Sequence, residues 1–286
     1  MLRFKRPKPP TGFAREVGPA VRATREAIVS GERPELPEHW GKHKAAFSAA
    51  QHGKCGYCET FALNHPSAID HFAPKRAVHI LVSEGIELDD LSNVRNRDTL
   101  EICGTGYHWI ACDWNNWLLA CERCNTRWKG SLFPVREDPH PCPPHPRRGY
   151  TALLLNPYGP ADPGEHLDFN SLGHIFPRNG SAAGDATIRT CGLHRESLRR
   201  ARAGIAADAD RLARRLEQAI LDGDHVTARQ AAEDLRLLGS EERAHAGMVR
   251  SLVRSRLDLS FRELGSLSRK IAALVRAGDM KPKIRS

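Results

Sequence analysis

The sequence predicts an α+β protein in which a small, zinc-stapled core lies between N-terminal helices and a C-terminal helical subdomain. Three observations lead to this prediction. Two Cys-x-x-Cys pairs offer metal ligands, and short apolar runs broken by Cys, His, Asn, Pro and Gly fill residues 55–134. From residue 187 onward the apolar residues instead follow a helical period.

Composition restricts the classes of protein to which the chain can belong. Its 286 residues are 40% apolar and 27% charged, as in ordinary globular proteins. No apolar run reaches the roughly 18 to 20 residues that span a bilayer, and the basic start MLRFKRPKPP precedes no apolar segment. We therefore expect a cytoplasmic protein without membrane association. Its net charge of +9 favours a polyanionic partner such as nucleic acid without establishing one.

The chain is expected to divide into four regions. Residues 1–52 form a basic arm and two helices, at 15–28 and 39–51, and residues 53–135 form the core, with an insertion at about 78–107. Residues 136–186 are a Pro-rich bridge followed by two short strands, in TALLLNPYG and LGHIFPRNG. Residues 187–286 form two or three long helices with breaks near Gly223 and Gly239. These helices either pack on the core or provide a docking surface for a partner protein.

The two Cys-x-x-Cys pairs predict a structural zinc site. Cys55 and Cys58 form the first pair, and Cys121 and Cys124 form the second. Each pair can present two sulfurs from a tight turn, and four thiolates make a closed tetrahedral set for Zn²⁺. Because a reducing compartment is expected, ligands or buried thiols are preferred to disulfides.

The other four cysteines lack a partner at metal spacing and are expected to be thiols. A second zinc ion that uses Cys103 or Cys112 with His108 is the alternative. The remaining two cysteines are Cys142 and Cys191.

The segment AIDHFAPK offers the groups that phosphodiester hydrolysis needs. A base must deprotonate water, and a divalent cation must offset charge on the phosphate and the leaving oxygen. A neutral imidazole at His71 suits the first role, and the carboxylate of Asp70 suits Mg²⁺ or Mn²⁺. An Asp-His pair alone is a weak signal, but Asn125 directly follows the second cysteine pair and Asn116 precedes it. Zinc would thus fix Asn125 relative to Asp70.

Taken in order, CGYCE, DHFAPK and N-x-x-L-x-x-C-x-x-C-N-x-x-x-K-G-x-x-F-P resemble a zinc-containing HNH nuclease of the ββα-metal type. The resemblance implies that His71 is the general base. It also implies that Asp70 and Asn125 bind one catalytic Mg²⁺ or Mn²⁺ ion, and that Asn116 braces the loop through backbone hydrogen bonds.

More narrowly, the segments WIACDWNNWLLAC, LLLNPYG, HLDFNSLGHIFPR and CGLHRESL resemble the HNH subunit of Septu-type and retron-linked anti-phage systems. This likeness spans about residues 55–202. It implies an ABC-type (SMC-like) ATPase partner that restrains or activates the nuclease, with the C-terminal third as a candidate contact. The long insertion between His71 and Asn116 departs from the family pattern.

Several aromatic and basic residues have two interpretations. The tryptophans of the core either pack around it or stack on unpaired bases. Basic residues near the second cysteine pair and at helical spacing farther on either contact phosphates or are solvated. The residues concerned are Trp109, Trp114, Trp117 and Trp128, then Arg127 and Lys129, and finally Arg195, Arg199 and Arg202.

Three functions remain open at this point. The first is a metal-dependent endonuclease that cuts DNA, with RNA, including transfer RNA, as a close variant. The second is a zinc-stabilised module that binds nucleic acid without cutting it. The third is an assembly subunit for a partner protein.

Overall fold

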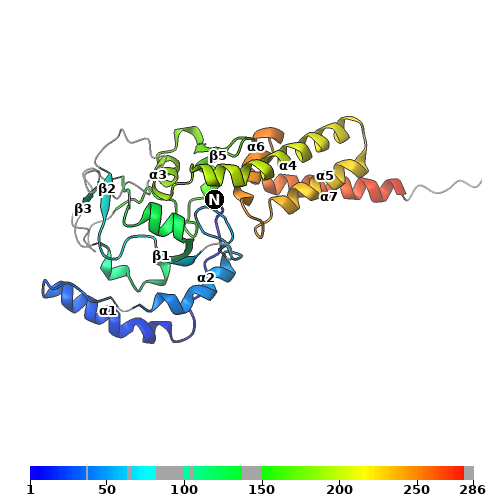
Figure 1. Cartoon of the computed structure of the whole chain (residues 1–286). Coiled ribbons are helices and arrows are strands. Elements are labelled where there is room, and N and C mark those ends of the chain that lie inside the picture. Colours follow the sequence, from blue (N-terminus) through cyan, green and yellow to red (C-terminus); the bar gives the residue numbers. More distant parts are fainter. Residues whose placement is uncertain (37, 63–65, 82–99, 103–105, 137–149, 280–286) are drawn as a thin grey trace, which may run out of the picture. The chain divides into compact units, whose positions relative to one another are not determined.

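The computed structural model describes residues 1–36, 38–62, 66–81, 100–102, 106–136 and 150–279 (Figure 1). Cys103, Cys142, most of the insertion predicted at about 78–107 and the Pro-rich bridge at 137–149 lie outside these residues. The described chain combines helices with small two-stranded sheets and divides into two compact units. The first unit comprises residues 1–166 and 176–195, and the second comprises residues 167–175 and 196–286.

The N-terminal helices of the first unit form where the sequence predicts them. Helix α1 spans Phe13–Val29, and the short helix η1 (Trp40–His43) leads directly into α2 (Lys44–Ala50). Val17 and Ala20 on the apolar face of α1 pack with Cys112.

Two strands from distant parts of the sequence form the sheet at the centre of the first unit. Strand β1 (Ser67–His71) pairs antiparallel with β4 (Trp117–Cys121), so that Ser67 lies opposite Cys121 and His71 lies opposite Trp117. Every residue of β4 is buried, as are the last three residues of β1. The sheet contributes to a core of large side chains with the helices α2 and η1. Its members are Leu36, Trp40, Phe47, Ile69, Ala111, Trp114, Trp117 and Leu119.

The remaining elements of the first unit are short. Strands β2 (His79–Leu81) and β3 (Leu100–Ile102) pair antiparallel. The other elements are η4 (His108–Ile110), η5 (Trp114–Asn116), the π-helix η6 (Arg123–Lys129), η7 (Pro163–Glu165), η8 (Arg178–Gly180) and α3 (Ala182–Cys191).

One of the two strands predicted after the bridge is absent. The segment TALLLNPYG makes a single β-bridge, between Ala152 and Val135, and is otherwise irregular. The reason is a tertiary contact, because the N–H of Leu155 donates to the hydroxyl of Thr187 on α3, at 2.8 Å, rather than to a neighbouring strand. The second prediction is confirmed by β6 (Ile175–Pro177), whose partner is β5 (Leu167–Phe169).

The second unit is predominantly helical, as the apolar period predicts. Its helices are α4 (Glu196–Leu221), α5 (His225–Leu238), α6 (Ala246–Leu257) and α7 (Phe261–Asp279), and the predicted breaks near Gly223 and Gly239 fall at helix ends. Alanines line the buried faces of α4 and α5, which lets the two helices approach closely. They are Ala206, Ala209, Ala213, Ala219, Ala228, Ala231 and Ala232. Among the described residues, no helix is both long and apolar enough to cross a membrane.

Candidate metal centre and adjoining polar site

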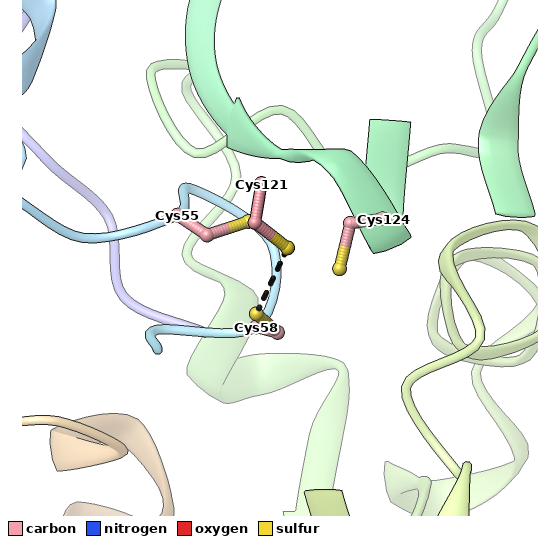
Figure 2. A group of neighbouring side chains, drawn as sticks. All are labelled: Cys55, Cys58, Cys121 and Cys124. Atoms are coloured by element: carbon pink, nitrogen blue, oxygen red, sulfur yellow. Dashed lines mark hydrogen bonds between the residues drawn. The ribbon is translucent and has the colours of Figure 1, made fainter. Parts of the chain in front are cut away.

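The four cysteines of the two Cys-x-x-Cys pairs come together in the first unit. Cys55 and Cys58 lie on a turn that follows α2, whereas Cys121 ends β4 and Cys124 lies on η6. All four are buried, and their sulfurs lie within 4.8 Å of one another. Figure 2 shows the four side chains gathered in one cluster.

The spacing of the sulfurs suits a tetrahedral ion. The Sγ atoms of Cys58 and Cys121 are 3.8 Å apart, whereas a disulfide needs about 2.05 Å. Four sulfurs at about 2.3 Å from a Zn²⁺ ion would be roughly 3.8 Å apart. The donor set and its geometry therefore fit a structural metal ion such as zinc.

The turn that carries the first pair is fixed by backbone contacts. The N–H of Cys55 donates to the carbonyl of Thr60 at 2.9 Å, and the N–H of Gly56 donates to the carbonyl of Leu119 on β4 at 2.9 Å. A side chain at Gly56 would come within 2.9 Å of the Leu118 side chain. Glycine thus allows the turn to lie directly against β4, which brings the two cysteine pairs together.

The pKa values of the clustered thiols are shifted in opposite directions. Hydrogen bonds from Cys121 and the other cysteines hold the pKa of the Cys58 thiol well below its ordinary value, while burial raises the pKa of Cys55 well above it. A bound zinc ion would replace the protons of the thiols, because Cys binds metals as the thiolate.

Arg195, one of the basic residues singled out in the sequence, contacts this cluster. Its Nη1 and Nη2 each lie 3.5 Å from the Sγ of Cys124, and Nη1 also donates to the carbonyls of Cys191 and Gly192. Although burial opposes the charged form, the charges of Cys124 and Cys58 raise the pKa of Arg195. A Zn²⁺ ion bound by four thiolates would carry a net charge of −2, which the guanidinium would partly offset.

The placement of Arg195 depends on one glycine. Gly192 ends α3 with a φ of +57° and lies flat against the indole of Trp128, so that a Cβ there would be 1.9 Å from Trp128 Cδ2. This close approach packs the segment after α3 against η6, the helix that carries Cys124. The packing also confirms the structural interpretation of Trp128, which is 8% exposed.

The predicted stripe of three exposed arginines is wrong. Arg195 is 8% exposed and serves the cysteine cluster, and Arg202 is 3% exposed, with its guanidinium 5.2 Å from the ring centroid of Phe169. Arg199 pairs with Glu196. The helical spacing is real from Glu196 onward, but the three side chains do not share one solvated face.

Asp70 lies in a buried polar network at the end of β1. Its Oδ2 accepts a hydrogen bond from the Tyr57 hydroxyl at 2.8 Å, and its Oδ1 accepts one from Lys129 Nζ at 3.1 Å. Lys129 also donates to the carbonyl of His71 at 2.8 Å. Because Lys129 is only 1% exposed, the expectation that it lies on the surface, either in contact with phosphates or solvated, is wrong.

The imidazole of His71 is held by its Nε2 atom. Nε2 lies 2.9 Å from the carbonyl of Ala111, which can only accept, so Nε2 carries the proton and Nδ1 carries the lone pair. Nδ1 faces Lys75 Nζ at 3.4 Å, and the ring meets Trp40 edge-on. Burial, followed by the charge of Lys75, lowers the pKa of His71 to about 3, so the ring is neutral near pH 7.

Asn116 fixes the chain directly after β1. Its Oδ1 accepts a hydrogen bond from the N–H of Ala73 at 2.8 Å, and its Nδ2 donates to the carbonyls of Ala73 at 3.0 Å and Ile110 at 3.2 Å. Its own carbonyl accepts a hydrogen bond from the N–H of Phe72. These contacts are of the kind that the resemblance implies, and a role for Asn116 in catalysis stays a prediction.

Asn125 lies half-buried on η6, directly after Cys124. Within the described residues, the four cysteines are the only group of three or more His, Cys, Asp or Glu side chains placed to hold one ion. Both oxygens of Asp70 already accept hydrogen bonds. The metal-binding roles of Asp70 and Asn125 for a catalytic Mg²⁺ or Mn²⁺ ion stay predictions.

Sequence reasoning missed three contributors to this network. Tyr57, between the first two cysteines, was not singled out, and neither was Lys75, four residues after His71. Trp40 packs on His71 and lies under Lys75, whose Nζ is 4.2 Å from its ring centroid. The only available signal was the nearness of Tyr57 and Lys75 to the motifs.

Two other predictions for the core can be compared with the structure. Trp114 and Trp117 belong to the hydrophobic core, which confirms their packing role. Cys112 packs among apolar residues of α1, and burial raises the pKa of its thiol, as expected for a core cysteine. The alternative of a second zinc site that uses Cys103 stays a prediction, because Cys103 lies outside the described residues.

Comparison with known proteins identifies a relative that shares about half of the chain. The chain is 37% identical over 160 residues to the Septu protein PtuB of Bacillus mycoides (strain KBAB4). The matched region covers 55% of this chain and 48% of that protein, so the chain spans about half the length of its relative. No family model matches the chain, and no solved structure matches it.

Proposed function

We propose that the chain is a metal-dependent HNH endonuclease that hydrolyses phosphodiester bonds of DNA, with RNA, including transfer RNA, as a variant substrate. The observation that carries the proposal is the state of His71, a neutral imidazole whose protonated nitrogen is anchored to Ala111 and whose other nitrogen faces an ammonium group. The similarity to a Septu protein supports a role in anti-phage defence.

His71 has the properties of a general base for an attacking water. The hydrogen bond from Nε2 to the Ala111 carbonyl fixes the tautomer and the ring orientation, which leaves Nδ1 able to take a proton. The positive charge of Lys75 contributes to the lowered pKa of His71. A substrate phosphate beside Lys75 would offset that charge and make Nδ1 a stronger base when substrate is bound.

The residues that hold His71 in place have distinct tasks. Asn116 fixes the backbone that follows the histidine, and Lys129 binds the carbonyl of His71 itself. Tyr57 links the first cysteine turn to Asp70, the residue before His71. The cysteine cluster thus orients the base through short chains of buried hydrogen bonds.

The resemblance to HNH nucleases implies that cleavage depends on a divalent metal ion. A divalent ion would supply stabilisation of the negative charge on the scissile phosphate and leaving oxygen. Asp70 and Asn125 are the ligands that the resemblance implies, but both oxygens of Asp70 are engaged by Tyr57 and Lys129 in this structure.

The test compares two histidine substitutions in the full chain. Plasmid DNA and total RNA are incubated with Mg²⁺ or Mn²⁺, with the protein alone and with the ATPase partner proposed below. We expect His71→Ala to keep its zinc and its circular dichroism spectrum while losing cleavage at least a hundredfold, in the range of a general base. His174→Ala, at an exposed histidine, is the control and should cut normally. Normal cleavage by His71→Ala would remove the base assignment.

A second function is favoured by one observation. Because Asp70 is buried and paired with Lys129, the site also suits a zinc-stabilised module that binds nucleic acid without cutting it. Binding by the complete complex with no cleavage under any divalent metal would select this second function.

The partner is proposed from the resemblance alone. We propose an ABC-type ATPase that contacts the chain through its residues after about 190. Co-purification of the two proteins that is lost when these residues are removed, while zinc is retained, would support the contact. Retention of the ATPase by the shortened chain would place the contact elsewhere.

A further inference from the structure

A small pocket opens beside the base, on the side of Lys75. It has a volume of about 240 Å³ and is lined by Arg33, Pro34, Leu36, Lys75, Arg76, Ala77 and His108. A wider hollow of about 910 Å³ shares four of these residues, including Arg33 and Arg76. The two hollows therefore share part of one wall.

The pocket is positively charged. Arg33, Lys75 and Arg76 contribute three cations, and among the described residues that line it there is no carboxylate. Burial, followed by the charge of Arg76, lowers the pKa of the Lys75 ammonium, and the carboxylates of Asp70 and Glu38 oppose this shift only in part. Cations gathered in this way repel one another, and a bound anion would relieve the repulsion.

The backbone that carries Lys75 and Arg76 is restrained by contacts with residues 106 and 107. Gly106 has a φ of +76°, and a Cβ there would lie 2.6 Å from the carbonyl carbon of Arg76. The N–H of Tyr107 donates to the carbonyl of Pro74 at 2.7 Å. The loop that carries Lys75 and Arg76 is therefore held before any ligand arrives, which lowers the entropic cost of binding.

Lys75 connects the pocket to the proposed base. Its Nζ is 3.4 Å from His71 Nδ1, and the same side chain lines the pocket. An anion held by Lys75 would consequently lie next to the nitrogen that takes the proton. The volume is below the roughly 300 to 1,000 Å³ of small-molecule sites, so a phosphate with part of its sugar fits better than a whole cofactor.

We propose that the pocket formed by Arg33, Lys75, Arg76 and His108 holds a backbone phosphate of the nucleic-acid strand, next to the bond that His71 helps to cut. The proposal rests on the proposed function and adds the path of the substrate strand. Arg33 comes from the segment between α1 and η1, which gives the N-terminal region a part in substrate binding.

The experiment measures binding and cleavage separately. Short fluorescein-labelled single strands and duplexes are titrated with the full chain without added divalent cation, between about 50 and 200 mM salt. The variants are Arg33→Gln and Arg76→Gln, and the matched control is Arg211→Gln, an exposed arginine of α4 that lines neither hollow. Zinc content and circular dichroism verify that each variant is folded.

We expect each pocket variant to weaken binding about 3- to 10-fold and to reduce the slope of log K against log salt by about 0.7 to 0.9, as for one lost phosphate contact. In cleavage assays with the partner complex, the same variants should raise KM and leave kcat within about twofold of wild type, since uniform binding is removed. The control should change binding less than twofold.

Three outcomes would overturn the proposal. Pocket variants that bind with wild-type affinity and salt slope would exclude a phosphate contact, even if the His71 test confirms cleavage. Absence of measurable binding by the wild-type chain would exclude it as well. A nucleoside monophosphate is titrated in the same way. If the pocket variants bind it more weakly than the wild-type chain does but bind the oligonucleotides equally well, the pocket holds a free nucleotide instead. Loss of cleavage in His71→Ala is scored independently, so failure of the pocket does not imply failure of the nuclease.

Discussion

The two compact units are stabilised by different kinds of contact. In the second unit, alanine-lined helix faces pack closely and polar groups serve mainly to cap and pair on the surface. In the first unit, buried polar side chains converge within one network that includes four thiols, Asp70, His71 and Lys129. Close packing of apolar faces is enough to stabilise a helical unit. A chemical site instead needs buried polar groups, and because burying them costs free energy, each must form hydrogen bonds or ion pairs with the others.

The largest expected effect is the loss of tertiary structure in the first unit alone. Cys121→Ser removes one of four ligands, and because a structural zinc ion contributes about 10 to 16 kcal/mol of apparent binding energy, the first unit should lose its fixed tertiary structure. Near-ultraviolet circular dichroism, which reports the core tryptophans, should collapse, while much of the helical far-ultraviolet signal from α4–α7 persists. Cys112→Ser, at a buried cysteine outside the cluster, should keep its zinc. Simultaneous loss of both signals in Cys121→Ser would show that the units depend on one another.

The next effect concerns the buried ion pair. Lys129→Met leaves the Asp70 carboxylate with Tyr57 as its remaining side-chain donor, and such unpaired buried charges cost about 3 to 5 kcal/mol. Urea denaturation should show this loss. Arg127→Met on the same helix, whose arginine is 59% exposed and paired with Glu122, should change stability by no more than about 0.5 kcal/mol. Equal effects of the two substitutions would contradict a structural role for the Lys129–Asp70 pair.

Arg195 gives a smaller effect on the metal itself. Arg195→Leu removes the hydrogen bonds to Cys124, and loss of such outer contacts typically lowers metal affinity about 10- to 100-fold. Competition with a chromogenic chelator measures the affinity, and the thiolate-to-Co²⁺ charge-transfer band reports the sulfur environment. Arg195→Lys should lie between, because it keeps the charge without the planar fork. Zinc affinity unchanged in Arg195→Leu, with Arg199→Leu as control, would refute this role.

The pH dependence of stability should reveal the buried neutral histidine. The pKa of His71 is about 3 in the folded chain and about 6.5 when unfolded. Between these values the unfolded chain binds more protons, so this contribution to stability is present above pH 6.5 and is lost as pH falls. Between pH 7 and pH 5 the loss is about 2 kcal/mol. His71→Gln should lose about 2 kcal/mol less than wild type over that range, and identical pH profiles would contradict the burial of a neutral ring.

The smallest effect tests the scaffold alone. Ser260 and Glu263 form reciprocal hydrogen bonds between side chain and backbone at the start of α7, which is a capping box. Ser260→Ala should destabilise the second unit by about 1 kcal/mol, measured by urea denaturation, with zinc affinity unchanged. A change in zinc content would show that stability and metal binding are coupled across the chain.

The sequence was most informative where one type of chemistry repeats at fixed spacing. The cysteine pairs required only that each turn present two sulfurs, and the helical period from Glu196 onward required only a buried face. Lys129 could not be placed in the same way. It meets Asp70 across 59 residues of sequence, and it does so from a π-helix, whose period differs from the one used to assign helix faces.

Arg195 illustrates a related limit. Its spacing from Arg199 and Arg202 predicted one helical face, but α4 begins at Glu196, so Arg195 precedes the helix and turns toward Cys124. The strand predicted in TALLLNPYG failed because a side-chain hydroxyl took the place of a strand partner. In both cases a tertiary contact outweighed a local pattern that was correctly recognised.

The register of β1 on β4 has a consequence for metal binding. With Ser67 opposite Cys121 and His71 opposite Trp117, a slip by one residue would turn the side chains of one strand to the opposite face. Because Cys121 ends β4, a slipped strand pair would not bring its sulfur to the other three. A zinc ion at these four cysteines would therefore bind best to the register that also places His71 opposite Trp117.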